Sequence, residues 1–189
     1  MIENKTDLKR YLESDRKSLE RKTKKPRIND YIWKYEIYLR KCEYYTNKKN
    51  KKCLEKFFGF YYRYKKFKLG NVLGYEIPLN VFDEGLSIAH KGPIVINSGA
   101  KIGKNCRIHI CVNIGTSAGK ENDAPIIGDN CYIGPGVKMF GNIKIGNNVA
   151  IGANAVVNKS FKEDSITIAG VPAKKVSERG NKFRTNVII

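Results

Sequence analysis

The sequence lacks several features that would identify whole classes of protein. Its five cysteines are an odd number without a Cys-x-x-Cys pair, so neither a disulfide framework nor a zinc site is indicated. No apolar run approaches the roughly 20 residues that span a bilayer. The N-terminal residues contain no apolar core of the kind that a signal peptide needs. The sequence therefore predicts a cytoplasmic protein that holds no metal.

Acidic residues and histidines are scarce. The chain carries 36 Lys and Arg against 18 Asp and Glu, a formal net charge of +18, and only 2 histidines. Residues 1–70 hold 22 of the basic residues and 9 of the acidic ones, together with most of the aromatic residues. A basic, aromatic segment of this kind can bind nucleic acid, which is one alternative function. It does not account for the features of residues 85–176.

A six-residue repeat occupies the second half of the chain. An apolar residue recurs at this step at Ile96, Ile102, Ile108 and Ile114, and again at Ile127, Ile133, Met139, Ile145, Ile151 and Val157. Neither a helix nor a strand has this period, whereas a parallel β-helix does. Because three repeats complete one coil, Ile96 should stack under Ile114 and Ile133 under Ile151. We expect a mainly β protein with a short N-terminal α-helical segment.

The rest of the chain divides around this repeat. Polar and basic breaks separate three expected helices, the first capped at Thr6–Asp7, the second at Asn29–Asp30, and the third ending at Gly70. We therefore predict a basic helical segment at residues 1–70, a β-helix domain at residues 71–176 and a basic C-terminal tail at residues 177–189.

The repeat is broken at one histidine. Counting back six residues from Ile96 gives His90, where an inward aliphatic residue is expected, directly below Ile108. Either the imidazole is buried with a hydrogen-bond partner, or the coil is distorted at residues 91–93 so that the ring faces a cleft. Imidazole titrates near neutral pH, so His90 is the leading candidate for a general base. His109 should lie close to His90, at a corner of the coil or on its surface.

A polar loop breaks the repeat a second time. Residues 115–125 separate Ile114 from Ile127 by thirteen residues rather than twelve. A loop that projects from a rigid scaffold can shape a binding cleft beside it. The alternative is an insertion without function.

The segments GLSIAHKGPIVIN (85–97) and ITIAGVPAKKV (166–176), with residues 100–120 and 124–157 between them, resemble the hexapeptide-repeat acetyltransferases, and most closely the serine acetyltransferase family. The resemblance covers about half of the chain. It implies a left-handed parallel β-helix and a homotrimer with active sites between subunits. It also implies acetyl transfer from acetyl-CoA to a hydroxyl group without a metal. Whether trimers pair through the helices is left open.

The resemblance also assigns residues. His90 matches the family's catalytic base. Positions near acetyl-CoA are Gly115, Thr116, Gly134, Pro135, Ala153, Ala169, Gly170 and Lys174, and the phosphates could also meet Lys120 and Lys175. A backbone N–H near Gly115 would stabilise the oxyanion. Other residues that could assist catalysis or bind the acceptor are His109, Glu76 and Asp83.

Three departures from the serine enzymes bear on the acceptor. Ala89 and Ala124 replace an Asp and a His of their active site, and Tyr75 aligns with the Asp that orients their catalytic histidine. Polar groups that would help to bind an amino acid are thus missing. The pattern resembles that of O-acetyltransferases of surface-polysaccharide biosynthesis, and this resemblance favours a sugar hydroxyl over serine as the acceptor. The basic N-terminal segment would then suit contact with the inner membrane surface. A catalytically silent β-helix scaffold is the remaining alternative.

Overall fold

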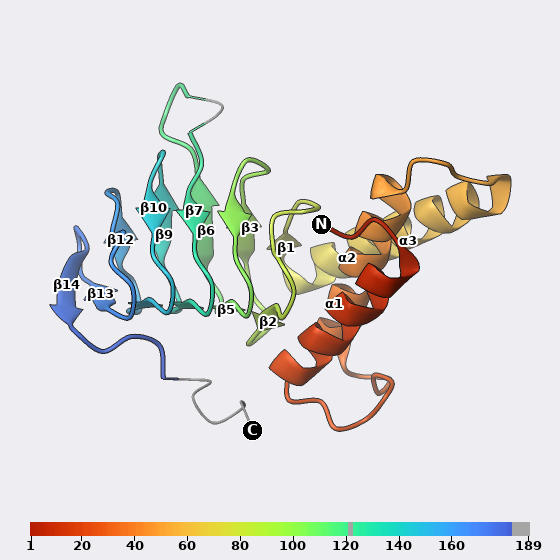
Figure 1. The fold of residues 1–189 in the computed structure, drawn as a ribbon, viewed down its shortest axis with the longest axis horizontal. Coiled ribbons are helices and arrows are strands. Elements are labelled where there is room, and N and C mark those ends of the chain that lie inside the picture. Colours follow the sequence, from red (N-terminus) through yellow and green to blue (C-terminus); the bar gives the residue numbers. More distant parts are fainter. Residues whose placement is uncertain (121–122, 183–189) are drawn as a thin grey trace.

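The computed structural model describes residues 1–120 and 123–182. Three helices come first, α1 (Lys5–Ser18), α2 (Tyr31–Asn47) and α3 (Cys53–Leu73). Short strands follow: β1 (Tyr75–Glu76), β2 (Ser87–Ile88), β3 (Ile94–Ile96), β4 (Lys101–Ile102), β5 (Arg107–Ile108), β6 (Val112–Gly115), β7 (Ile126–Ile127), β8 (Tyr132–Ile133), β9 (Lys138–Phe140), β10 (Lys144–Ile145), β11 (Ala150–Ile151), β12 (Val156–Val157), β13 (Thr167–Ala169) and β14 (Lys174–Ser177). The helices lie at one end of the strands and β14 lies at the other (Figure 1). No described helix combines the length and the apolar character needed to cross a membrane.

The described strands wind into a three-faced parallel β-helix. One face has the order β1-β3-β6-β9-β12, the second β10-β7-β4, and the third β14-β13-β11-β8-β5-β2. The pairs are parallel except β13 with β14, which is antiparallel. The expected left-handed parallel β-helix with a short helical N-terminal segment is therefore confirmed.

The inward positions stack as the six-residue repeat predicts. Ile96 pairs with Ile114, and Ile133 pairs with Ile151. All ten repeat positions are at most 4% exposed. Burial of one apolar side chain per repeat thus forms a continuous core along the axis, which is the main source of stability in this architecture.

The predicted start of the first helix is wrong, and that of the second is confirmed. α1 begins at Lys5, where the Asn4 side chain accepts a hydrogen bond from the Asp7 amide at 2.9 Å, so Thr6–Asp7 is not its cap. The second predicted start is confirmed, because the Asp30 side chain accepts from the Trp33 amide.

The third helix continues beyond its predicted end. α3 runs three residues past Gly70, and Gly74 ends it in the left-handed conformation at φ 78°. Gly70 is needed for a different reason. A Cβ there would lie 2.9 Å from the carbonyl oxygen of Tyr75, so only glycine permits this close approach.

Buried charge joins the helices to the first coil. Arg40 in α2 is fully buried and pairs with Asp15 of α1 at 2.7 Å and with Glu43 at 3.1 Å. Its guanidinium also donates to the carbonyl oxygens of Phe82 at 2.9 Å and Asp83 at 2.7 Å. One side chain therefore satisfies two carboxylates and two carbonyls at the start of the β-helix.

The same helices supply acceptors for the free amides of this coil. Asp15 accepts from the amides of Gly85 and Leu86, at 2.8 and 2.9 Å, and Glu36 accepts from the amide of Ile88 at 3.0 Å. A sheet edge with unpaired amides would otherwise invite non-native pairing. The helical segment thus caps the end of the β-helix with buried ionic groups.

Candidate functional site

His90 lies on the surface of the β-helix, so the buried alternative is wrong and the coil is distorted after this residue. Ile88 pairs with Ile108 and is the buried residue of this coil, whereas His90 is exposed two residues later. The spacing from Ile88 to Ile108 is two residues longer than the regular eighteen. Counting back in steps of six therefore misplaces His90, which stands at a corner and faces solvent.

This corner repeats on successive coils. The amide that follows each strand of the β2-to-β13 face donates to the carbonyl of the next coil: Ala89 to Ile108, His109 to Ile133, Gly134 to Ile151 and Gly152 to Ile168, at 2.8–3.1 Å. We call the stacked residues the corner column. Its first row is Ala89, His109, Gly134, Gly152 and Ala169, and its second row is Ile110, Pro135, Ala153 and Gly170, with His90 beside His109 at the start of the column. The histidines and five of the predicted donor-site residues thus share one edge.

His109 stands beside His90, as the sequence predicts. Their ring centroids are 5.7 Å apart, and the His109 ring is 5.0 Å from that of Tyr132. Burial, reinforced by the Arg107 guanidinium and by His90, lowers the pKa of His109 to about 4. Its Nε2 atom is buried and has no hydrogen-bond partner in the described part of the chain. His109 is therefore neutral at pH 7 and stands beside the exposed His90.

Tyr75 holds the backbone of His90. The buried tyrosine hydroxyl donates to the main-chain carbonyl of His90 at 2.7 Å, and its ring packs edge-on against Tyr35 at 5.0 Å. The resemblance of the sequence to the serine acetyltransferases implies an orienting Asp at the position of Tyr75. Here it fixes the main chain of the histidine rather than its imidazole.

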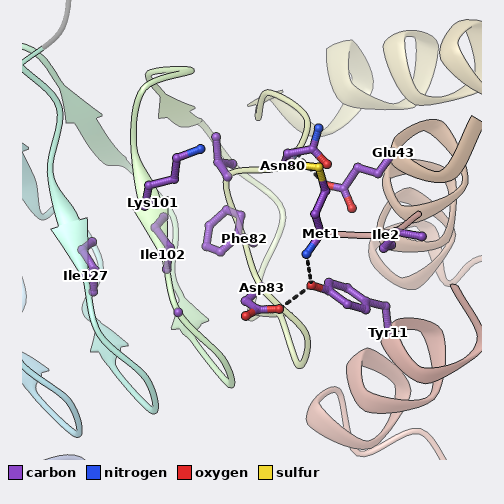
Figure 2. A pocket seen from close by; sticks show the side chains of 12 residues that line it. Met1, Ile2, Tyr11, Glu43, Asn80, Phe82, Asp83, Lys101, Ile102 and Ile127 are labelled. Carbon is purple, nitrogen blue, oxygen red and sulfur yellow. Dashed lines mark hydrogen bonds between the residues drawn. The ribbon is translucent and has the colours of Figure 1, made fainter. Parts of the chain in front are cut away.

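Neither predicted acidic partner joins His90. The Asp83 carboxylate accepts from the Tyr11 hydroxyl, which in turn accepts from the terminal ammonium of Met1 at 3.1 Å. These groups line a cavity of about 340 Å³ together with Lys101 (Figure 2). Although burial opposes ionisation, hydrogen bonds from Tyr11 and from the Glu84 amide hold the pKa of Asp83 below its usual value.

Glu76 lies on the outer side of β1, opposite to the buried Tyr75. It lines another cavity, of about 870 Å³, beside Arg63 and Lys66 of α3. Among residues 1–120 and 123–182, no hydrogen bond or ion pair connects His90 with Glu76 or Asp83. These residues also contain no group of three or more His, Cys, Asp or Glu side chains placed to hold a metal ion.

Residues 115–120, the described first part of the polar loop, leave the β-helix at a different corner from that of His90. Gly115 ends β6, and Thr116 follows it, whereas His90 precedes β3, the strand that pairs with β6. Gly115 and His90 therefore lie beyond opposite ends of neighbouring strands. Lys120 is exposed in the loop, where its amide donates to Ser117 at 3.1 Å. Within one chain, the described residues 115–120 of the loop therefore do not lie beside His90.

The corner column has only small side chains and proline between Gly134 and Gly170. A Cβ on Gly134 would lie 2.7 Å from the Ile151 carbonyl oxygen and 2.9 Å from the Ala153 amide, so the coils approach too closely for a side chain there. Pro135 accepts from the Asn154 amide at 2.8 Å, directly beside Ala153. The column therefore offers a smooth edge between His109 and Gly170.

The two basic residues at the end of the column differ. Lys175 pairs with Glu163 at 2.5 Å and with Glu178 at 2.8 Å, which engages its ammonium group. Lys174 is exposed on β14. Of the two, Lys174 is the better placed to meet a phosphate.

Comparison with known proteins identifies the repeats. Residues 124–159 match the family model described as bacterial transferase hexapeptide (six repeats). A serine acetyltransferase of Staphylococcus aureus (strain Mu50 / ATCC 700699) is 43% identical over 97 residues, which are 50% of this chain and 45% of that protein. The resemblance that the sequence predicts, to hexapeptide-repeat enzymes of the serine acetyltransferase type, is confirmed.

Solved structures agree in fold. A serine acetyltransferase from Brucella abortus strain S19 in complex with coenzyme A superposes with a TM-score of 0.71 and 22% identity, over 94% of this chain and 70% of that one. A soybean serine acetyltransferase complexed with serine gives a TM-score of 0.70 and 22% identity, over 90% and 70%. The alignments span less than half the length of the curated relatives.

Proposed function

We propose that this chain, built on bacterial transferase hexapeptide repeats, is an O-acetyltransferase that moves an acetyl group from acetyl-CoA to the hydroxyl of L-serine. The names of the curated relatives support serine, in place of the sugar acceptor that the sequence alone favoured. The Brucella and soybean structures, with coenzyme A and with serine, support the donor and the acceptor.

The corner column is the observation that carries the proposal. The exposed His90 lies at one end of an edge, and the sequence resemblance implies that the upper positions of this edge, Gly134 to Gly170, line the coenzyme channel. A donor lying along this smooth edge would bring its thioester toward the histidines. Binding both substrates against one rigid edge lowers the entropic part of the barrier.

His90 is the proposed general base. It would take the proton of the serine hydroxyl as the oxygen attacks the thioester carbonyl, so that a C–O bond forms. The C–S bond then breaks, and the same proton passes to the sulfur of coenzyme A. A backbone N–H near Gly115 would stabilise the tetrahedral oxyanion.

We further propose that the site is completed between two subunits of a homotrimer. The loop at Gly115 and the His90 corner lie at opposite ends of paired strands within one chain. A neighbouring copy related by a three-fold axis would set its loop against this corner. The resemblance to trimeric acetyltransferases supports the same arrangement.

The acceptor is tested by the release of coenzyme A thiol from acetyl-CoA. Purified protein is assayed with L-serine in one series and with nucleotide sugars and oligosaccharides in another. We expect saturable turnover with L-serine. Turnover with L-threonine is a matched control, since its extra methyl group probes the fit of the acceptor pocket.

A sugar acceptor is the second candidate, and a specific observation favours it. Ala89 and Ala124 remove two polar side chains, and Ala124 is 7% exposed within the core. Turnover with a sugar and none with serine would make these alanines the specificity determinants and would overturn the serine assignment. Absence of thiol release with every acceptor would favour the silent scaffold.

A further inference from the structure

Helix α3 carries an exposed aromatic face. Phe57, Phe60, Tyr64 and Phe67 are 63%, 73%, 53% and 66% exposed, and their spacing of three or four residues places them on one side of the helix. We call these four residues the α3 aromatic face. Patches of this kind on a protein surface mark contacts with a partner or a membrane.

The opposite side of α3 is already covered. Tyr62 stacks on Tyr45 of α2 with ring centroids 5.8 Å apart, and Phe58 stacks on the same tyrosine at 6.1 Å. α2 and α3 therefore hold each other through one set of aromatic rings. The α3 aromatic face is a second set, which faces away from this contact.

Basic residues border the face on both sides. By helical geometry, Lys56 and Arg63, seven residues apart, lie along one flank and Lys68 lies along the other, and all three are exposed. The only acidic residue of α3, Glu55, is bound by Lys48 at 2.5 Å. The face therefore presents aromatic rings between two positive borders, and α3 itself contributes no unpaired carboxylate to it.

A second copy of the helix does not match this pattern. Paired helices that shared the stripe would bring Lys56, Arg63 and Lys68 against the same residues of the partner. Like charges at these flanking positions disfavour pairing. An anionic lipid bilayer matches both features, because aromatic rings partition into the interface and basic residues are attracted to anionic headgroups.

We propose that the α3 aromatic face docks on an anionic lipid bilayer, with the helix axis in the plane of the interface. The sequence had suggested membrane contact from net charge alone, and the structure supplies the surface. α3 lies at the end of the molecule opposite to β14 (Figure 1). The bilayer would therefore meet the helical end of the protein. This docking does not depend on the acetyl-transfer reaction.

Co-sedimentation of the full chain with vesicles tests the aromatic part. Wild type should bind vesicles of phosphatidylcholine with phosphatidylglycerol, and should bind phosphatidylcholine vesicles weakly. Phe60→Ser/Phe67→Ser should lower the partition coefficient about tenfold or more. The control Ile28→Ser/Val176→Ser removes side chains that are 89% and 61% exposed elsewhere, and should bind like wild type. Circular dichroism checks that each variant is folded.

A second pair of variants tests the charges. Replacing Lys56, Arg63 and Lys68 by Gln should weaken binding, by about fivefold for each residue near the surface. Replacing Lys22, Lys24 and Lys25, which are exposed in the loop before α2, removes the same net charge and should change binding less than twofold. Equal losses in both triple variants would mean that only net charge matters, and would overturn the docking face.

Two further outcomes would overturn the proposal. One is wild type that fails to bind anionic vesicles. The other is a smaller molar mass for Phe60→Ser/Phe67→Ser in sedimentation equilibrium without lipid, which would make the face an interface between copies of the chain. Vesicle binding with an unchanged molar mass supports the bilayer.

Discussion

Arg40 in α2 and Ile127 in β7 are both buried, but their surroundings have opposite chemistry. Arg40 contacts two carboxylates and two backbone carbonyls at the helical end of the molecule. Ile127 lies between Ile102 and Ile145 in the interior of the β-helix. The regular coils are stabilised by apolar stacking. The end of the β-helix, where backbone groups have no further coil, requires ionic and hydrogen-bonding partners.

The largest expected effect on stability comes from removing Arg40 from the buried ionic cluster at the helical end of the molecule. Arg40→Met leaves Asp15 and Glu43 without their cation and should lower the free energy of unfolding by about 3–5 kcal/mol. Chemical denaturation followed by circular dichroism measures the change. Arg27→Met, at an exposed position, should stay within about 0.5 kcal/mol of wild type. Equal stability of the two variants would contradict a structural role for the buried cluster.

Two adjacent residues of β7 probe the apolar interior. Ile127 is 2% exposed and Ile126 is 42% exposed, so the same substitution meets opposite environments. Ile127→Ala should cost about 2–5 kcal/mol through lost burial and a cavity. Ile126→Ala should cost less than about 1 kcal/mol. Similar costs in denaturation would show that the predicted inward column is misassigned.

Substitutions of Glu36 distinguish the requirement for a hydrogen-bond acceptor from the requirement for a negative charge. Burial and the nearby Asp15 raise the pKa of Glu36 well above its usual value. Glu36→Gln keeps an oxygen for the Ile88 amide and should change stability by less than about 1 kcal/mol. Glu36→Ala leaves that amide unsatisfied and should cost about 1–3 kcal/mol. A glutamine variant as unstable as the alanine variant would show that the negative charge is required.

A further expected effect, which appears only below neutral pH, is a pH dependence at His109. Because the folded-state pKa is about 4, the unfolded chain binds more protons between that value and its own pKa near 6.5. This contribution to stability is present above pH 6.5 and is lost as the pH falls toward 4. Thermal unfolding at several pH values should show a shallower slope in His109→Gln than in wild type. An unchanged slope would place the titration elsewhere.

Much of the β-helix could be predicted from the sequence, because every six-residue step must bury one apolar side chain. For His90 the repeat left two alternatives, and the buried one is wrong because the chain between Ile88 and Ile94 adds residues at Gly92, whose φ is 144°. The repeat indicates where it is interrupted, but not the path that the chain takes there.

The buried ionic cluster around Arg40 was not predicted from the sequence. Glu36, Arg40 and Glu43 are spaced as ordinary ion pairs on an exposed helix surface, and spacing alone does not distinguish a buried cluster from such a surface. One signal was available in the sequence. The charged residues Asp15 and Arg40 stand close along their helices to the hydrophobic residues Tyr11 and Leu39. The hydrogen bond from Tyr75 to the His90 carbonyl was not predicted either, because it depends on tertiary contacts.

The central claim is that His90 of one subunit acts with the Gly115 loop of another, and a complementation assay tests it most directly. His90→Asn should lose about 100- to 10,000-fold in turnover while still binding coenzyme A. Thr116→Trp should fill the donor site beside the loop and also be inactive. When the two variants are unfolded together and reassembled, about a quarter of wild-type turnover should return, because a quarter of the shared sites would then pair an intact histidine with an intact loop. Mixed oligomers, identified by native mass spectrometry, that remain as inactive as either variant alone would contradict the account.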